Sequence, residues 1–126
     1  MWSSLNKPRI LVVECDELVA IFVQLKLELF GCQTVGQAKT GEKAIQLAGE
    51  LRPDLILMDV VMPGQNGFQL TRAINRTPEY AKIPIIICSS KNLETDRVWG
   101  MRQGARDYIT KPVAPAELLS KIKALD

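Results

Sequence analysis

The sequence contains no histidine, which excludes histidine-based catalytic triads and histidine metal sites within this chain. Cysteine is scarce as well, and the three residues Cys15, Cys32 and Cys88 do not have the spacing of a metal motif. Because their number is odd and no signal peptide is recognisable, we expect reduced thiols and a cytoplasmic protein. No apolar stretch approaches the roughly 18–20 residues needed to cross a bilayer, so we expect no membrane partner.

A strong charge of either sign is also missing. Sixteen Lys and Arg residues oppose fourteen Asp and Glu residues, and the net charge of +2 is spread along the chain. This balance predicts no binding to nucleic acid or to membrane surfaces. No glycine-rich loop follows the first predicted strand, which argues against a flavin or dinucleotide site. The length of 126 residues predicts one domain, here over 9–126, after a polar N-terminal lead-in at 1–8.

Short apolar runs alternate with segments of helical periodicity. The sequence predicts strands at 9–13, 33–36, 54–59, 84–88 and 107–110, and the one at 33–36 is weak, short and placed towards an edge of the sheet. Helices are predicted at 17–30, 42–51, 66–75, 92–103 and 115–125. This alternation predicts an α/β fold with a parallel sheet that helices cover on both faces.

Three of these helices carry specific expectations. The first has an apolar stripe at positions 18, 21, 22, 25 and 29. In the second, Ala44, Ile45, Leu47 and Ala48 are expected to form the buried side. For the fourth helix, Asn92 is the expected N-cap.

Polar side chains follow the predicted strands, at the edge where open α/β sheets bind ligands. Asp59 ends the third strand, and the break at Pro63 and Gly64 predicts that it is exposed on a loop. Ser89 follows the fourth strand and Lys111 the fifth. Acids, a hydroxyl and a lysine at one edge are suited to phosphoryl transfer onto a carboxylate, where positioning and charge neutralisation do most of the work.

With these residues in place, the chain resembles the receiver domain of bacterial response regulators, from Arg9 to Leu125. The resemblance is strongest at 54–67 and 107–112. It implies a flavodoxin-like (βα)5 three-layer sandwich, with a five-stranded parallel sheet of order 2-1-3-4-5. It also implies that Asp59 accepts a phosphoryl group from a sensor histidine kinase in the presence of Mg²⁺.

The resemblance further assigns roles to individual positions. Ser89 matches the switch hydroxyl, and Tyr108 matches the aromatic residue that moves inward on activation. Lys111 matches the active-site lysine, whose bond to Pro112 is cis in the family. The metal ligands it implies are Glu14, Asp59 and the backbone carbonyl of Val61.

One position departs from the family pattern, which has two adjacent acids after the first strand. Here the pair reads Glu14-Cys15, so Cys15 stands where an acidic Mg²⁺ ligand is missing. A thiol is a poor ligand for Mg²⁺, so Cys15 is expected to weaken metal binding, and Asp16 is a possible substitute. A redox or soft-metal role for Cys15 is disfavoured because no second cysteine has partner spacing.

Two functions therefore stay open. The first is a phosphoacceptor switch that presents a protein-binding surface over about 92–125, as a monomer or a phosphorylation-linked dimer. The second is a degenerate receiver that binds proteins without phosphorylation because of Cys15. A hydrolase of the haloacid-dehalogenase type is rejected, since Val61 stands where its general acid is needed. The segment 94–113 resembles the response regulators of type IV pilus twitching motility.

Overall fold

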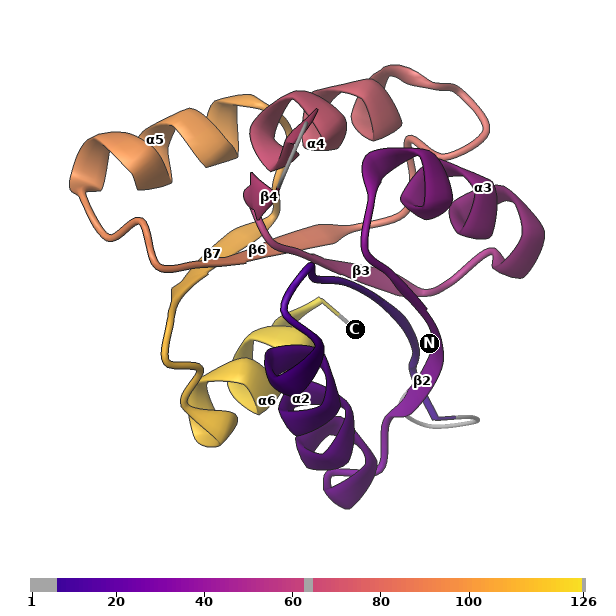
Figure 1. The fold of residues 1–126 in the computed structure, drawn as a ribbon, viewed down its shortest axis with the longest axis vertical. Helices are drawn as coiled ribbons and strands as arrows, with labels where there is room; N and C mark the ends of the chain where they lie inside the picture. The colour runs from indigo at the N-terminus through magenta and orange to yellow at the C-terminus, as the bar shows by residue number, and fades with distance from the viewer. Residues whose placement is uncertain (1–6, 63–64, 126) are drawn as a thin grey trace.

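A parallel sheet of five strands forms the centre of the fold (Figure 1). The computed structural model describes residues 7–62 and 65–125, so nearly all of the predicted lead-in at 1–8 lies outside the described residues. The strand order is β2-β1-β3-β6-β7. Because β6 and β7 are the fourth and fifth strands of this sheet, the predicted order 2-1-3-4-5 is confirmed. The strands are β1 (Arg9–Val13), β2 (Gln33–Ala38), β3 (Leu55–Met58), β6 (Ile85–Ser89) and β7 (Asp107–Thr110).

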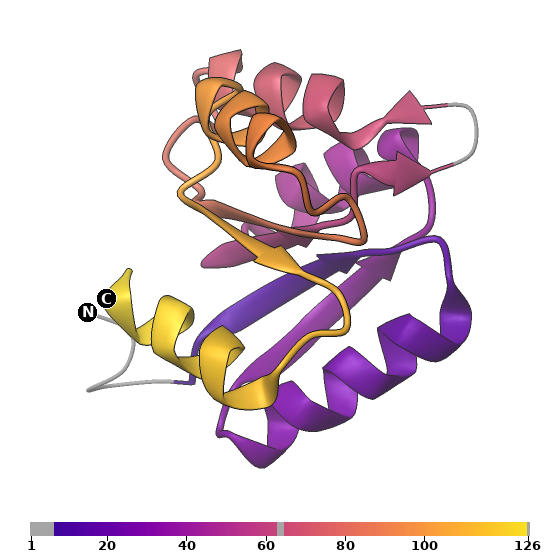
Figure 2. The ribbon, with the colours of Figure 1, turned by 90° about the vertical axis from the view of Figure 1, so that its left-hand side faces the viewer.

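Five helices cover the two faces of the sheet, which gives the predicted flavodoxin-like three-layer fold. Helices α3, α4 and α5 lie over one face, and α2 and α6 lie over the other (Figures 1 and 2). They are α2 (Glu17–Leu29), α3 (Gly41–Leu51), α4 (Gly67–Arg76), α5 (Glu94–Arg102) and α6 (Pro115–Ala124). Within the described residues, no helix is both long and apolar enough to cross a membrane.

The strands are continuous apolar runs because both faces of the sheet are buried. Side chains alternate between the faces, so β1 contributes Leu11 and Val13 to the core under α3 and α4, and Ile10 and Val12 to the core under α2 and α6. All four of these side chains are at most 2% exposed. The sheet is therefore held rigidly from both sides, which fixes the positions of the residues at its carboxyl edge.

The apolar stripe of α2 faces away from the sheet. Leu18 and Leu29 are 78% and 75% exposed, and the rest of the stripe is also exposed. The residues that α2 buries against the sheet are Ala20, Val23 and Leu27. The helix is thus apolar on both sides, and its outer side presents hydrophobic surface to solvent.

Two local predictions for the helices were wrong. In α3, Ala44 and Ala48 are buried, but Ile45 is 38% exposed because it lies on the solvent side of the helix. Asn92 does not cap α5, which begins at Glu94 with Leu93 as its N-cap residue. There the Asp96 carboxylate accepts a hydrogen bond from the Leu93 amide, at 3.2 Å, so the capping group comes from inside the helix.

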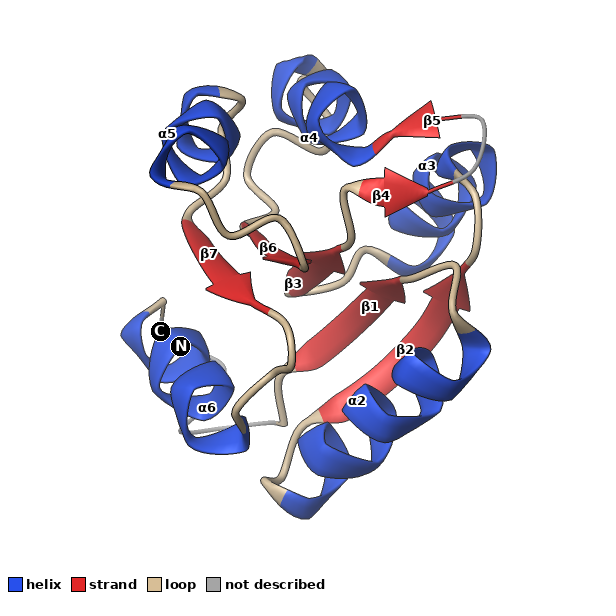
Figure 3. Ribbon diagram, turned by 60° about the vertical axis from the view of Figure 1, so that its left-hand side comes forward, coloured by secondary structure: helices blue, strands red, loops and turns tan. Residues whose placement is uncertain are grey.

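A small hairpin that the sequence did not predict separates β3 from α4. It consists of β4 (Val61–Met62) and β5 (Gln65–Asn66), which pair antiparallel (Figure 3). The predicted turn residues Pro63 and Gly64 lie outside the described residues. Gly67 then starts α4 directly against the chain after β3, and a Cβ atom there would lie 2.3 Å from the Asp59 carbonyl oxygen. This close approach requires glycine.

Candidate functional site

The register of the sheet brings the predicted acidic residues together. Val13 on β1 pairs with Met58 on β3, which pairs with Ile87 on β6. The residues that follow on β1 and β3, Glu14 and Asp59, therefore leave the sheet side by side. The Asp59 amide donates a hydrogen bond to the Val13 carbonyl, at 2.9 Å, which extends the strand pairing to this edge.

Lys111, which follows β7, reaches across the sheet edge to both acids. Its Nζ lies 2.5 Å from Oε2 of Glu14 and 3.6 Å from Oδ2 of Asp59. Burial lowers the pKa of Lys111, but the hydrogen bond to Glu14 and the two carboxylate charges outweigh this and raise it above 10.5. For Glu14, burial raises the pKa above 4.5 despite the opposing hydrogen bond from Lys111. The three groups form one buried, mutually dependent charge cluster.

Asp59 is buried rather than exposed on a loop as predicted. Only 4% of its surface is accessible, since Lys111 lies beside its carboxylate and Gly67 at the start of α4 lies against its backbone carbonyl. One carboxylate oxygen, Oδ1, accepts a hydrogen bond from the Val61 amide at 3.1 Å. The other, Oδ2, faces Lys111. The carboxylate is thus held in one orientation with a cation beside it.

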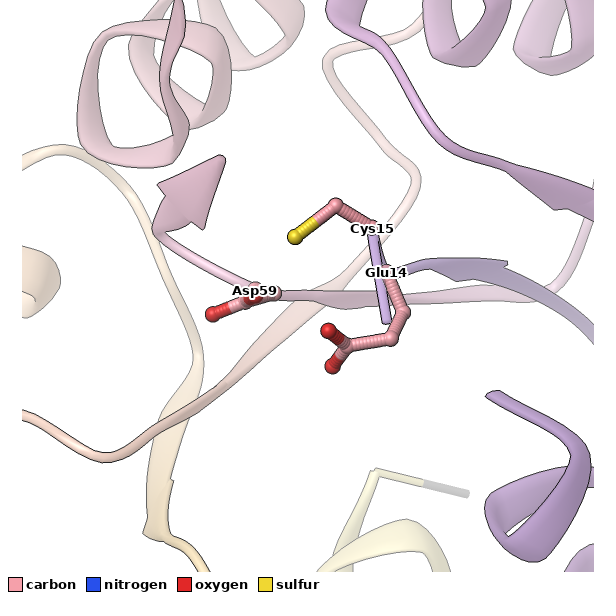
Figure 4. Close-up of side chains that lie close together, drawn as sticks. All are labelled: Glu14, Cys15 and Asp59. Carbon is pink, nitrogen blue, oxygen red and sulfur yellow. The ribbon is translucent and has the colours of Figure 1, made fainter. Parts of the chain in front are cut away.

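Cys15 lies beside the two acids. The Cys15 thiol and the Glu14 and Asp59 carboxylates lie close together, with one ligand atom from each within 4.8 Å of the others (Figure 4). The thiol donates a hydrogen bond to the Val61 carbonyl, with Sγ and O 3.5 Å apart. Burial raises the pKa of this thiol, and the charges of Asp59 and Glu14 raise it further. Cys15 is therefore a neutral thiol at neutral pH.

Asp16, the possible substitute ligand, is engaged elsewhere. Its Oδ1 accepts hydrogen bonds from the amides of Leu18 and Val19, at 2.9 and 3.2 Å, and so caps the first turn of α2. It is exposed to solvent, whereas the cluster formed by Glu14, Cys15 and Asp59 is mostly buried. In this structure the carboxylate of Asp16 does not replace the acid missing at position 15.

The residues expected to switch, Ser89 and Tyr108, both contact the backbone of Lys91. The fully buried Ser89 hydroxyl accepts a hydrogen bond from the Lys91 amide at 3.1 Å, and the Tyr108 hydroxyl donates one to the Lys91 carbonyl at 2.7 Å. The Tyr108 ring lies inward and is 3% exposed. Gly100 of α5 makes room for it, since a Cβ there would lie 3.2 Å from the ring. Lys91 therefore links the site to the face formed by α5 and β7.

A second charged network, which the sequence analysis missed, lies next to this face. Asp107 on β7 pairs with Lys121 of α6 at 2.9 Å and with Arg97 of α5 at 3.6 Å. Burial raises the pKa of Asp107, but the Lys121 hydrogen bond, the Tyr108 amide and the two cations outweigh this and lower it below 3.8. The partners are 10 and 14 positions away in sequence, so only the fold brings them together.

An apolar groove borders the site on the α2 side. Its volume is about 500 Å³, and it runs between α2 and the loop that follows β7. The peptide bond between Lys111 and Pro112 in that loop is cis. The groove is lined by Leu18, Val19, Phe22, Val23, Lys111, Pro112 and Val113. Lys111 belongs to both the groove and the charge cluster, so the two are continuous.

The comparison with protein families agrees with this geometry. The model of the response regulator receiver domain matches residues 10–123. The chain belongs to the receiver domain family. Receiver domains are signalling domains, and the resemblance inferred from the sequence is confirmed.

Individual relatives match the receiver over most of its length. Protein PilH of Pseudomonas aeruginosa is 46% identical over 117 residues, which cover 93% of this chain and 96% of PilH. The phosphate regulon regulator PhoB of Escherichia coli K12 is 40% identical, but the chain spans only 51% of PhoB. Among solved structures, a putative response regulator from Chloroflexus aurantiacus is 30% identical with a TM-score of 0.89, covering 95% of this chain and 98% of its own.

Receiver domains generally bind Mg²⁺ in an acidic pocket, and the donor set here can be tested against that ion. The Glu14 and Asp59 carboxylates and the Val61 carbonyl are the hard oxygen donors that Mg²⁺ prefers. The Cys15 sulphur is not such a donor, and the Cys15 thiol donates a hydrogen bond to the Val61 carbonyl. The donor set is therefore a weakened fit for Mg²⁺: three oxygen donors remain, but a thiol stands where a further acidic ligand is expected.

Proposed function

We propose that this receiver accepts a phosphoryl group on Asp59 from a histidine kinase and thereby changes a protein-binding surface. The observation that carries the proposal is the position of Lys111, whose ammonium lies 3.6 Å from the Asp59 carboxylate at the buried end of β3. A cation there neutralises charge on the phosphoryl oxygens, and electrostatic positioning supplies most of the catalysis in this chemistry.

In the proposed step, a carboxylate oxygen of Asp59 attacks the phosphorus of a phosphohistidine on the donor. The new bond is an acyl phosphate O–P bond, and the bond that breaks is the P–N bond to the imidazole. The imidazole nitrogen keeps the electron pair of the broken bond and takes up a proton from solvent. The Lys111 ammonium can shift from the Glu14 and Asp59 carboxylates toward the phosphoryl oxygens, because it already contacts both acids.

The donor would approach over the apolar groove between α2 and the loop after β7. This groove borders Lys111, so a helix seated on it places its side chains next to the charge cluster. Leu18 and Phe22 on the rim are 78% and 46% exposed, which leaves apolar surface free for a partner. No residue of this chain can supply the histidine, since the sequence contains none.

For the output, we propose the surface of α5, β7 and α6, within about residues 92–125. Ser89 and Tyr108 share the Lys91 backbone, so a phosphoryl group that draws in Ser89 also acts on the tyrosine ring. Such a group shifts an equilibrium between two arrangements of the segment that contains Lys91. The likeness to PilH, a twitching motility response regulator, supports a role in the same kind of control.

Intact mass spectrometry tests the phosphoacceptor directly. The chain is incubated with Mg²⁺ and acetyl phosphate, and the wild type is expected to gain the mass of one phosphoryl group. Asp59→Asn is expected to gain none, whereas Asp54→Asn, at the opposite end of β3, is expected to behave as the wild type. Uptake that persists in Asp59→Asn contradicts the proposal.

The second candidate is a receiver that binds its partner without phosphorylation, and Cys15 is the feature that favours it. The same experiment separates the two functions. A wild type that takes up no phosphoryl group at saturating Mg²⁺, together with a Cys15→Asp variant that does, supports the degenerate receiver. Uptake by the wild type supports the switch.

A further inference from the structure

We propose that the Glu14–Cys15–Asp59 pocket departs from the Mg²⁺ preference of its family: Cys15 weakens Mg²⁺ binding and makes a thiophilic divalent cation of the Zn²⁺ class the preferred ligand. The inference deepens the proposed function, on which it rests for the role of the pocket. It concerns which cation binds, so it can be tested without phosphorylation.

The first argument is the donor set. One atom each from the Glu14 carboxylate, the Cys15 thiol and the Asp59 carboxylate lie within 4.8 Å of one another, a grouping that could hold a metal ion once the side chains draw slightly closer. The Val61 carbonyl lies 3.5 Å from the same sulphur. Four donors, one of them sulphur, match the ligand number of Zn²⁺, which accepts both sulphur and oxygen ligands.

The second argument is what Mg²⁺ would have to displace. Mg²⁺ gains little from a neutral thiol, yet it must break the Cys15–Val61 hydrogen bond to reach the carbonyl. It also meets the Lys111 ammonium, whose single positive charge already offsets one of the two carboxylate charges of Glu14 and Asp59. Among the residues that the structure describes, the site thus offers Mg²⁺ two shared carboxylates and no third acid, because Asp16 caps α2 instead.

A thiophilic cation must displace the same hydrogen bond and approach the same ammonium, but it gains a bond to sulphur in return. It displaces the thiol proton to solvent and forms a metal–thiolate bond, so the site gains one negative charge on binding. Glu14, Asp59 and the Cys15 thiolate then carry three negative charges, against one on Lys111 and two on the cation. The bound pocket is therefore neutral, which suits a site where Glu14 and Asp59 are only 6% and 4% exposed.

A partner cysteine is not needed for this reading. The sequence analysis disfavoured a soft-metal role because no second cysteine has suitable spacing. The fold supplies the other donors from the ends of β1 and β3, so the missing cysteine no longer counts against the site. Cys32 precedes β2, at the other end of the sheet from this pocket, and provides a thiol for a matched control.

The experiment is a titration of the reduced chain with Cd²⁺ and, separately, with Mg²⁺. Ultraviolet absorption detects the thiolate-to-Cd²⁺ charge-transfer band, and calorimetry gives both affinities. Wild type, Cys15→Asp, Cys15→Ser and Cys32→Ser are compared, and circular dichroism establishes that each variant is folded. Cys15→Ser keeps the size of the side chain, so it reports on sulphur even if Cys15→Asp fails to fold.

The wild type and Cys32→Ser are expected to show the charge-transfer band and to bind Cd²⁺ more tightly than Mg²⁺. Cys15→Ser is expected to lose the band. Cys15→Asp is expected to bind Mg²⁺ at least about 10-fold more tightly than the wild type. Even the loss of a residue that only supports a metal ligand typically lowers metal affinity by that factor. A band that is absent from the wild type or persists in Cys15→Ser overturns the inference, as does equal Mg²⁺ affinity in Cys15→Asp and wild type. None of these results depends on whether Asp59 is phosphorylated.

Discussion

The ammonium of Lys111 lies 2.5 Å from the carboxylate of Glu14, although 97 positions separate the two residues in sequence. The pair joins the end of β1 to the end of β7 across the carboxyl edge of the sheet. Glu14 is 6% exposed at its side chain and Lys111 20%, so water screens the pair only partly. The charge cluster around Asp59 therefore contributes to stability as well as to the proposed chemistry.

Lys111→Met is expected to destabilise the chain by about 3 kcal/mol at pH 7, because it leaves Glu14 buried beside Asp59 without its cation. The loss should shrink as the pH falls, since protonation removes the uncompensated charge of Glu14, whose pKa burial already raises. Urea unfolding at several pH values measures this. The double variant Glu14→Gln/Lys111→Met is the control and should recover most of the stability; a Lys111→Met variant as stable as the wild type contradicts the account.

Gly67→Ala is expected to cost about 3 kcal/mol in unfolding free energy. A Cβ at this position would lie 2.3 Å from the Asp59 carbonyl oxygen and 2.4 Å from the Val60 Cα, and neither backbone atom can move without displacing the end of β3. Gly36→Ala is the matched control. Its nearest neighbour is a terminal methyl of Leu51 at 2.9 Å, which can rotate away, so thermal or urea unfolding should show a much smaller loss. Equal losses would contradict the role of Gly67.

The two sides of α2 are expected to respond differently to the same substitution. Leu27→Ala removes a fully buried side chain and should cost about 2–5 kcal/mol. Leu18→Ala, on the same helix, removes a side chain that is 78% exposed and should change stability by no more than about 0.5 kcal/mol. Parallel urea unfolding curves measure both. A large loss in Leu18→Ala would show that the outer stripe is packed in solution.

Asp107→Asn is expected to reveal a pH-dependent contribution to stability. Because the folded-state pKa of Asp107 lies below its usual 3.8, the carboxylate stabilises the fold fully above that value, and this contribution is lost as the pH falls through the folded-state pKa. The stability difference between wild type and Asp107→Asn should therefore be constant near neutral pH and shrink in acid. Urea unfolding from neutral to acidic pH measures this stability difference. A difference that grows as the pH falls would contradict the prediction.

The strands and the parallel sheet could be predicted from the sequence because their signals are local, whereas the strand order came from the resemblance to receiver domains. Apolar runs such as Ile85–Ile87 predict strands that are buried on both faces, and their alternation with helical segments predicts a parallel sheet. The convergence of Glu14, Asp59 and Lys111 follows from the same rule, since the carboxyl ends of parallel strands share one edge. These predictions needed no knowledge of side-chain packing.

The errors occurred where packing between distant segments decides the outcome. The turn after Asp59 suggested an exposed acid, but Gly67 lies against its backbone and Lys111 beside its carboxylate, and Asp59 is buried. The cap of α5 comes from Asp96 rather than Asn92, because the loop geometry places the Leu93 amide beside that carboxylate. The buried side of α2 was not predicted: Ala20, Val23 and Leu27 pack against the sheet, and the apolar stripe faces solvent.

Residue-resolved detection of the acyl phosphate tests the central claim most directly. The chain is treated with acetyl phosphate and then with borohydride, which reduces an aspartyl phosphate to homoserine, and peptide mass spectrometry locates the modified residue. The account predicts homoserine at position 59 and no modification elsewhere. Homoserine at another aspartate, or none at 59 with saturating Mg²⁺ and acetyl phosphate, would contradict the assignment of Asp59 as the phosphoacceptor.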